Sequence, residues 1–90
     1  MPVEIRPDWI CEVISPSNAS HDTVRKLRLY QAAAVPHYWL CDPRASSLTV
    51  LRWSPEGYVT VLVAERGETV RPEPFGELQL AVGTLFGDDA

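Results

Sequence analysis

The fold of this chain is decided by residues 6–17, which read RPDWICEVISPS. Residues 9–14 form a short apolar run that ends in a serine- and proline-rich segment, as a strand followed by a turn does. Because side chains alternate along a strand, Ile10 and Glu12 share one face and Cys11 lies on the other. A lone buried carboxylate is costly, so Glu12 should lie near a sheet end, pair with a cation or bind a metal.

A helix is predicted after this strand. Ser20 is a plausible N-cap, and Val24 and Leu27 have the helical spacing of a core-facing pair. The alanine-rich residues 30–34 favour the helix until Pro36 stops it.

Three polar side chains on this helix are spaced four residues apart: Asp22, Lys26 and Tyr30. They line one stripe, apart from the core-facing pair, and Lys26 is the natural partner for Glu12. A plain alternative stays open, because Asp22 and Lys26 could be an ordinary surface pair and Tyr30 a core residue. Neighbouring basic residues, Arg25 to Arg28, could contact phosphates, although three charges on one helix are more often a solvated face.

The second apolar run, residues 38–41, is closed by Asp42-Pro43 and predicts a strand parallel to the first, which completes a βαβ unit. Residues 47–53 and 58–65 are two further strand-like runs around a turn sequence, so they predict an antiparallel hairpin. A turn at residues 66–68, a short strand at residues 77–82 and a closing turn around Leu85-Phe86 follow. The expected fold is one mixed-sheet α/β domain over residues 1–90.

Composition limits the possible functions. The 90 residues are 46% hydrophobic and 22% charged, which is typical of a globular domain. A net charge of −4 argues against a module that holds nucleic acid by bulk positive charge. No apolar run approaches the length of a membrane span, so we expect a cytoplasmic protein. Cys11 and Cys41 match no disulfide or zinc pattern and are interpreted as small apolar residues.

These residues resemble a known family. The run from Pro7 to Ser17, then Asp22, Lys26 and Tyr30, then residues 35–43 (VPHYWLCDP), are similar to the Uma-type restriction endonuclease family of the PD-(D/E)XK nuclease superfamily. The similarity covers about half of the chain closely, and the hairpin and the Leu85-Phe86 ending fit more loosely.

The resemblance implies a restriction-endonuclease-like fold and DNA cleavage that depends on Mg²⁺ or Mn²⁺. It gives Glu12 the role of the metal-binding acidic residue and Lys26 that of the motif lysine, displaced from the strand position at Ile14 to the helix. Asp22 and Tyr30 would support the site, and the Val13 carbonyl would be a further metal ligand.

The chain departs from the family pattern at its N-terminal end. The family has an upstream region that supplies a second metal-binding aspartate, so this chain is expected to be the C-terminal part of the fold. Asp8 is a candidate supporting residue, but four strand residues span about 13 Å, too far to share a metal with Glu12 without a bend or a partner subunit. An active nuclease, completed in a homo-oligomer, and an inactive remnant that serves as a self-associating module both stay open.

Overall fold

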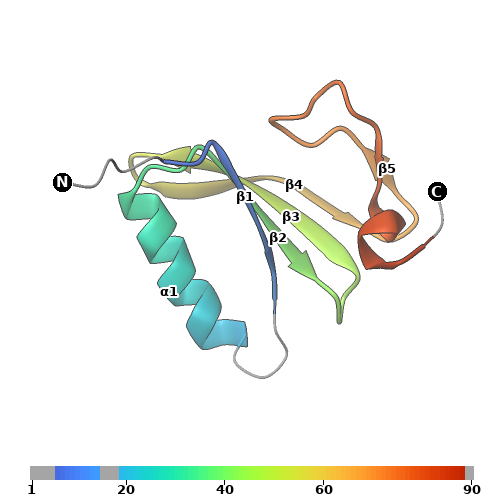
Figure 1. The fold of residues 1–90 in the computed structure, drawn as a ribbon, viewed down its shortest axis with the longest axis horizontal. Coiled ribbons are helices and arrows are strands. Elements are labelled where there is room, and N and C mark those ends of the chain that lie inside the picture. The colour runs from blue at the N-terminus through green and yellow to red at the C-terminus, as the bar shows by residue number, and fades with distance from the viewer. Residues whose placement is uncertain (1–5, 15–18, 89–90) are drawn as a thin grey trace.

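The structure of the chain is a computed structural model that describes residues 6–14 and 19–88. Strand β1 leads into helix α1, and three longer strands follow before a C-terminal segment of short elements (Figure 1). The elements are β1 (Trp9–Val13), α1 (Ala19–Ala32), β2 (His37–Asp42), β3 (Ser47–Ser54), β4 (Gly57–Glu65), β5 (Thr69–Val70), β6 (Leu80–Ala81) and the 3-10 helix η1 (Val82–Phe86).

Four strands form one mixed sheet in the order β1-β2-β3-β4. β1 and β2 run parallel and are joined through α1, whereas β2, β3 and β4 are successive antiparallel neighbours. The predicted mixed α/β fold, with a βαβ unit followed by an antiparallel hairpin, is therefore confirmed. In this sheet Glu12 lies beside Leu40 of β2, which fixes the position of its side chain relative to α1.

Helix α1 ends in a left-handed turn formed by an alanine. Ala34 has φ of 57°, and its N–H donates to the Gln31 carbonyl while the Val35 N–H donates to the Tyr30 carbonyl, each at 3.1 Å. This pair of hydrogen bonds is a Schellman motif, which usually places glycine at the left-handed position. The turn directs Val35 into the core, where it is buried, and starts β2 after Pro36.

Aromatic side chains pack α1 against one face of the sheet. The Tyr38 ring, fully buried, makes edge contacts with Tyr30 of α1 and tilted contacts with Tyr58 of β4. The Tyr58 hydroxyl donates to the Val35 carbonyl at 2.7 Å, and the Trp53 indole donates to the Gln31 carbonyl at 3.0 Å. Burial, with a smaller contribution from Tyr30, raises the pKa of Tyr58 to about 12, so this donor stays protonated.

The other face of the sheet is covered by the C-terminal segment, which lies at the far side of the sheet from α1 (Figure 1). Glu73 attaches this segment to the sheet. Its carboxylate accepts hydrogen bonds from Arg52 of β3 and lies 3.1 Å from the His37 ring of β2. The Trp39 indole also donates to the Glu73 carbonyl oxygen at 2.8 Å. The buried cluster beneath the segment consists of Trp39, Cys41, Leu48, Val50, Ala64 and Val82.

Three expectations differ from the structure. β5 was not predicted, because a two-residue strand has no periodicity and forms only by pairing with β6. Ser20 lies inside α1, which begins at Ala19, so the cap position falls outside the described residues. Val24, expected on the core face, is 48% exposed, since the helix presents Tyr30 and its neighbours to the sheet instead.

Within the described residues, no helix has the length and apolar character that a membrane crossing requires. β1 and β4 are the two edge strands of the sheet that these residues form.

Candidate functional site

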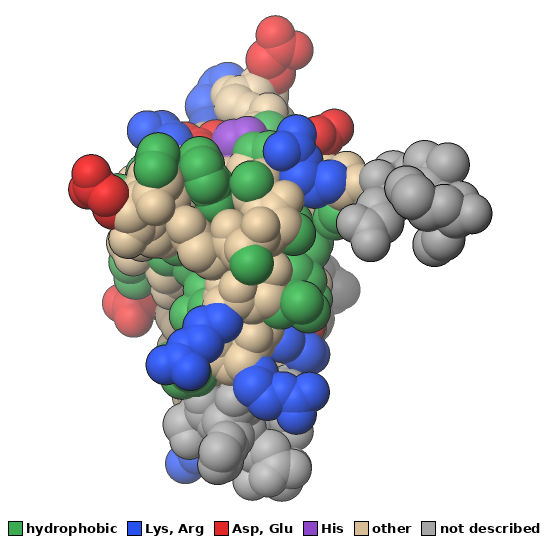
Figure 2. Space-filling model, turned by 90° about the vertical axis from the view of Figure 1, so that its left-hand side faces the viewer, with side chains coloured by type: hydrophobic (Ala, Val, Ile, Leu, Met, Phe, Trp, Pro, Cys, Tyr) green, Lys and Arg blue, Asp and Glu red, His purple; other side chains and the backbone are tan. Residues whose placement is uncertain are grey.

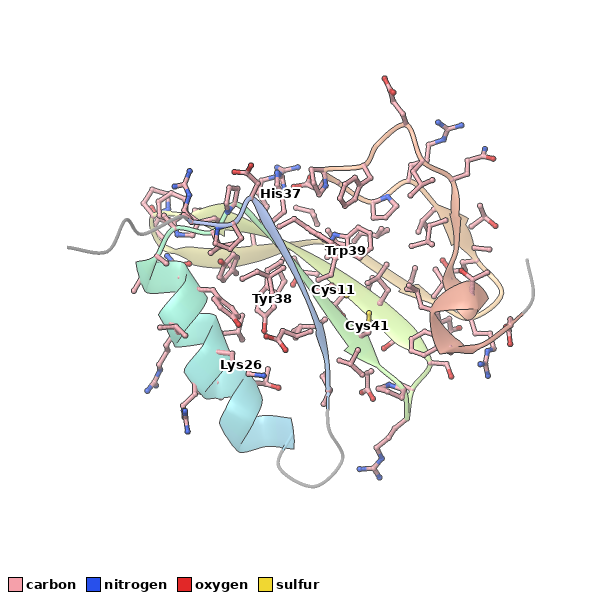
Figure 3. The ribbon with its side chains drawn as sticks, viewed as in Figure 1. Cys11, Lys26, His37, Tyr38, Trp39 and Cys41 are labelled. Atoms are coloured by element: carbon pink, nitrogen blue, oxygen red, sulfur yellow. The ribbon has the colours of Figure 1, made fainter. Side chains whose placement is uncertain are left out.

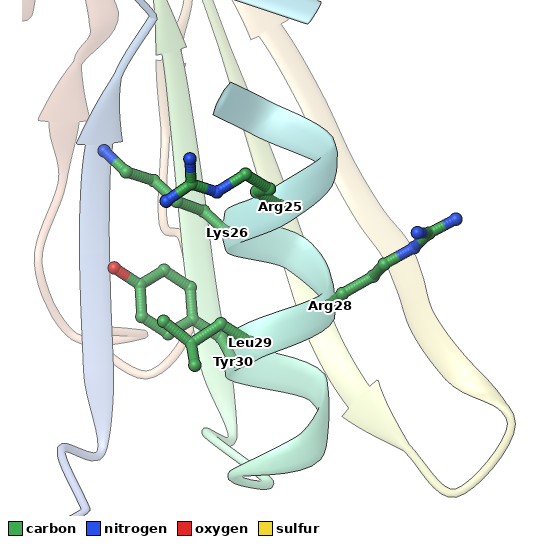
Figure 4. Close-up of a pocket in the computed structure, with 5 residues that line it drawn as sticks. All are labelled: Arg25, Lys26, Arg28, Leu29 and Tyr30. Atoms are coloured by element: carbon green, nitrogen blue, oxygen red, sulfur yellow. The ribbon is translucent and has the colours of Figure 1, made fainter. Parts of the chain in front are cut away.

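The candidate site is centred on Glu12, in the middle of the edge strand β1. Its side chain is 22% exposed and points to the face that α1 covers. The Lys26 ammonium donates to Oε2 at 3.1 Å, and the Tyr30 hydroxyl donates to Oε1 at 2.8 Å. Lys26 and Tyr30 are one helical turn apart, so both reach β1 from the same stripe of α1 (Figure 4). The predicted contact between Glu12 and Lys26 is present.

This arrangement gives the Glu12 carboxylate a defined orientation. The nearby ammonium offsets part of the desolvation cost of a half-buried carboxylate, and the hydroxyl fixes its second oxygen. A carboxylate offers about four lone-pair positions, so each Glu12 oxygen can still bind another group. Such a network also occurs where a charge pair serves packing alone, so the geometry by itself assigns no chemistry.

Val13 presents a second oxygen donor near Glu12. The Ile14 N–H donates to the Cys41 carbonyl at 2.8 Å, so the peptide groups of Ile14 point toward β2. Because consecutive residues of a strand point their peptide groups in opposite directions, the Val13 carbonyl points to the outer edge of β1. Its side chain is 64% exposed, on the opposite face from Glu12.

The sequence suggested two aspartates, Asp8 and Asp22, as supporting residues. Neither forms a contact with Glu12 among the described side chains. Asp8 is exposed in the bend that precedes β1 and takes part in no ion pair or hydrogen bond among the described residues. Asp22 lies in α1, but its side chain falls outside the described part of the structure. Of the predicted site residues, the structure therefore joins Glu12, Lys26 and Tyr30.

Glu12 and the Val13 carbonyl are oxygen donors of the type that a magnesium ion binds, but they are too few to complete its coordination. A carboxylate and a main-chain carbonyl are the hard oxygen ligands that Mg²⁺ prefers, and Mg²⁺ takes about six of them. Among the side chains that the structure describes, no group of three or more His, Cys, Asp or Glu lies together. Glu12 and the Val13 carbonyl would therefore be only part of a magnesium site, and its other ligands would have to be water or carboxylates outside this group.

A shallow groove of about 500 Å³ lies beside this site. Its described lining comes entirely from α1: Arg25, Lys26, Arg28, Leu29 and Tyr30 (Figure 4). The groove therefore shares two residues with the Glu12 network and adds two arginines, which the spacing of the sequence had left as a solvated face or a phosphate contact.

The two cysteines form a contact that the sequence did not predict. Cys11 and Cys41 lie on the neighbouring strands β1 and β2, with their sulfur atoms 3.6 Å apart and both thiols free (Figure 3). The hydrogen bond from Cys41 lowers the pKa of Cys11 to about 7, and the same bond raises the pKa of Cys41. Cys41 is buried, as expected of a small apolar residue, but Cys11 is exposed. Only the strand register, which pairs Val13 with Cys41, could have revealed the contact.

Two comparisons with known proteins found matches, and both matches are described as putative nucleases. A family model described as "Uma2: Putative restriction endonuclease" matches residues 1–83. A solved protein from Anabaena variabilis, described as a putative nuclease belonging to DUF820, superposes with a TM-score of 0.71 at 26% sequence identity. The match covers 92% of this chain and 45% of that protein, so the chain spans less than half of its length. The search of curated proteins found no significant match.

Proposed function

Because this chain belongs to the Uma2 family of putative restriction endonucleases, we propose that it carries part of a metal-dependent site that hydrolyses phosphodiester bonds in DNA. The observation that carries the proposal is the contact of both Glu12 oxygens with Lys26 and Tyr30 on the helix that follows the strand. The proposal treats residues 1–90 as one domain, the C-terminal part of the family's fold, and agrees with the cytoplasmic location expected from the sequence.

In this proposal Glu12 and the Val13 carbonyl hold Mg²⁺ or Mn²⁺, which when bound polarises a phosphoryl oxygen and supplies hydroxide from water. Lys26, held by Glu12, places a positive charge beside the phosphate and stabilises the negative charge that develops on it. Tyr30 fixes the orientation of the Glu12 carboxylate. Asp8 and Asp22 are proposed as supporting residues of this site.

A duplex DNA cleavage assay, run with Mg²⁺, with Mn²⁺ and with EDTA, tests this function. Glu12→Gln and Lys26→Ala should each lower the cleavage rate by about 10²-fold or more, because each removes a group that acts on the reacting phosphate. Tyr30→Phe should lower it by about tenfold, since one hydrogen bond to a carboxylate is lost.

The matched control is Glu56→Gln, the same chemical change at an exposed residue of the turn between β3 and β4. It should cleave as the unaltered chain does, and circular dichroism should show that every variant is folded at the temperature of the assay. Cleavage that persists in EDTA, or that survives Glu12→Gln, would contradict the proposal.

The exposed edge of β1 favours a second candidate: an inactive remnant of the fold that serves as a self-associating module. Trp9 and Val13 are 37% and 64% exposed on this strand, and an unpaired edge can add a further strand. A homo-oligomer formed this way would also be able to supply ligands to the Glu12 site from a second copy.

A further inference from the structure

We propose that the groove on α1 binds the phosphate backbone of duplex DNA through Arg25 and Arg28, next to the Glu12–Lys26 pair. This inference rests on the proposed function and names how the substrate is held. Phosphate contacts set the register of a protein on DNA without reading its sequence, so two arginines beside a hydrolytic site would act as positioning residues.

The first argument is the local charge. The chain has a net charge of −4, but between Thr23 and Ala32 the charged side chains of α1 are all basic. Lys and Arg side chains gather over the lower part of the face that contains α1; further Lys and Arg side chains lie near the upper rim, where most acidic side chains of that face also lie (Figure 2). A local cationic surface of this kind can attract a polyanion to one face of an acidic protein.

The second argument is that these arginines are available. Arg52 and Arg66 hold the carboxylates of Glu73 and Asp88, so their charges are used within the fold. Arg25 and Arg28 are exposed and take part in none of the ion pairs that join described side chains. An arginine that forms no ion pair with a described side chain can give its planar fork to a phosphate, which it binds through two parallel hydrogen bonds.

The third argument is placement. Arg25 extends from α1 on the same side as Lys26, toward β1, while Arg28 extends to the opposite side of the helix (Figure 4). The two arginines and Lys26 thus spread positive charge across the width of α1, and Leu29, 63% exposed, lines the groove on the side of Arg25 and Tyr30 (Figure 4). A DNA backbone lying across the helix would meet successive cations and end at the Glu12 network.

DNA binding in EDTA tests the groove without any cleavage. The probe is a short fluorescein-labelled duplex, and its anisotropy is measured over a series of salt concentrations. Arg25→Ala and Arg28→Ala should each weaken binding equally for unrelated DNA sequences, and should each lower the salt slope of log Kobs by about 0.9. Arg25→Lys should restore most of the slope, because it keeps the charge.

The control is the double variant Arg44→Ala/Arg71→Ala, which removes two exposed arginines that do not line the groove. It should change the slope less than either groove variant. An equal change would show that bulk charge alone matters and would overturn the inference, as would unchanged binding of the groove variants or an absence of binding by the unaltered chain. A groove variant that alters the mass in light scattering but not DNA binding would assign the groove to a protein partner, which also overturns it.

Failure of the hydrolytic proposal gives a different result. If DNA binds with the expected salt slopes but is not cleaved, the result supports DNA binding by the groove and contradicts the hydrolytic role of Glu12. If DNA is cleaved but the groove variants leave the salt slopes unchanged, the result supports the hydrolytic role and contradicts DNA binding by the groove.

Discussion

At the scale of single residues, Glu12 and Glu73 are two carboxylates with different surroundings. Glu12 faces a lysine and a tyrosine from one helix, whereas Glu73 joins an arginine and a histidine from two strands. The contacts of Glu12 follow from strand alternation and helix periodicity, so the sequence could predict its pairing with Lys26. The contacts of Glu73 depend on how a proline-rich segment folds back over the sheet, which no local pattern encodes.

The Glu73 contacts predict a pH-dependent contribution to stability. The hydrogen bond from Arg52 holds the pKa of Glu73 below its usual value. A carboxyl group whose pKa is lower in the folded state stabilises the fold above its unfolded pKa, about 4.5, and loses that contribution as the pH falls through the folded value. Glu73→Gln should therefore lower Tm by about 2–6 °C at pH 7, since the carboxylate is partly exposed.

The difference in Tm should shrink steadily as the pH is lowered below about 4. Thermal unfolding followed by circular dichroism over a pH series measures it, with Glu56→Gln as the control for the loss of one surface charge. A Glu73→Gln difference that stays constant from pH 7 to pH 3 would contradict the assigned role.

At the scale of elements, the end of α1 carries a strained residue. Ala34 adopts the left-handed conformation in a Schellman turn, where the Cβ of an L-residue costs about 1–2 kcal/mol and glycine costs less. Ala34→Gly should raise the free energy of unfolding by about 0.5–1 kcal/mol, the strain relieved minus the added entropy of the unfolded glycine.

Chemical denaturation measures this change. The neighbouring variant Ala33→Gly is the matched control, because Ala33 is not among the residues with positive φ and gains only flexibility. It should lower stability by about 0.5–1 kcal/mol. If both variants destabilise the chain, the left-handed turn is not a source of strain.

Elements were predictable to different degrees. The four strands of the sheet and α1 have clear periods and turn sequences, and their predicted ranges agree with the structure to within one or two residues wherever the residues are described. β5 and β6 are two residues each and pair with each other. β6 lies inside the predicted strand of residues 77–82, whereas β5 has no local pattern and its position followed from that pairing.

At the scale of the whole molecule, the sheet ends in β1, whose outer side has no strand partner among the described residues. Self-association through this edge predicts a mass in light scattering of at least twice the 10.1 kDa of one chain. Val13→Lys should reduce that mass to one chain, because an exposed charge on an edge strand opposes pairing.

Val63→Lys is the matched control, since Val63 is 62% exposed on the opposite edge strand β4. It should leave the mass unchanged. A monomeric unaltered chain, or a dimer that only Val63→Lys disrupts, would contradict association through β1.

The sequence by itself determined the order of the elements, the mixed α/β fold and the pairing of Glu12 with Lys26. Those features depend on alternation along one strand and on the turns of one helix, which are local properties. Only the tertiary structure decided that Cys11 meets Cys41, that Glu73 meets Arg52, and that Arg25 shares a groove with Lys26. Such contacts depend on strand register and on the direction in which α1 packs, and these are set by burial across the whole chain.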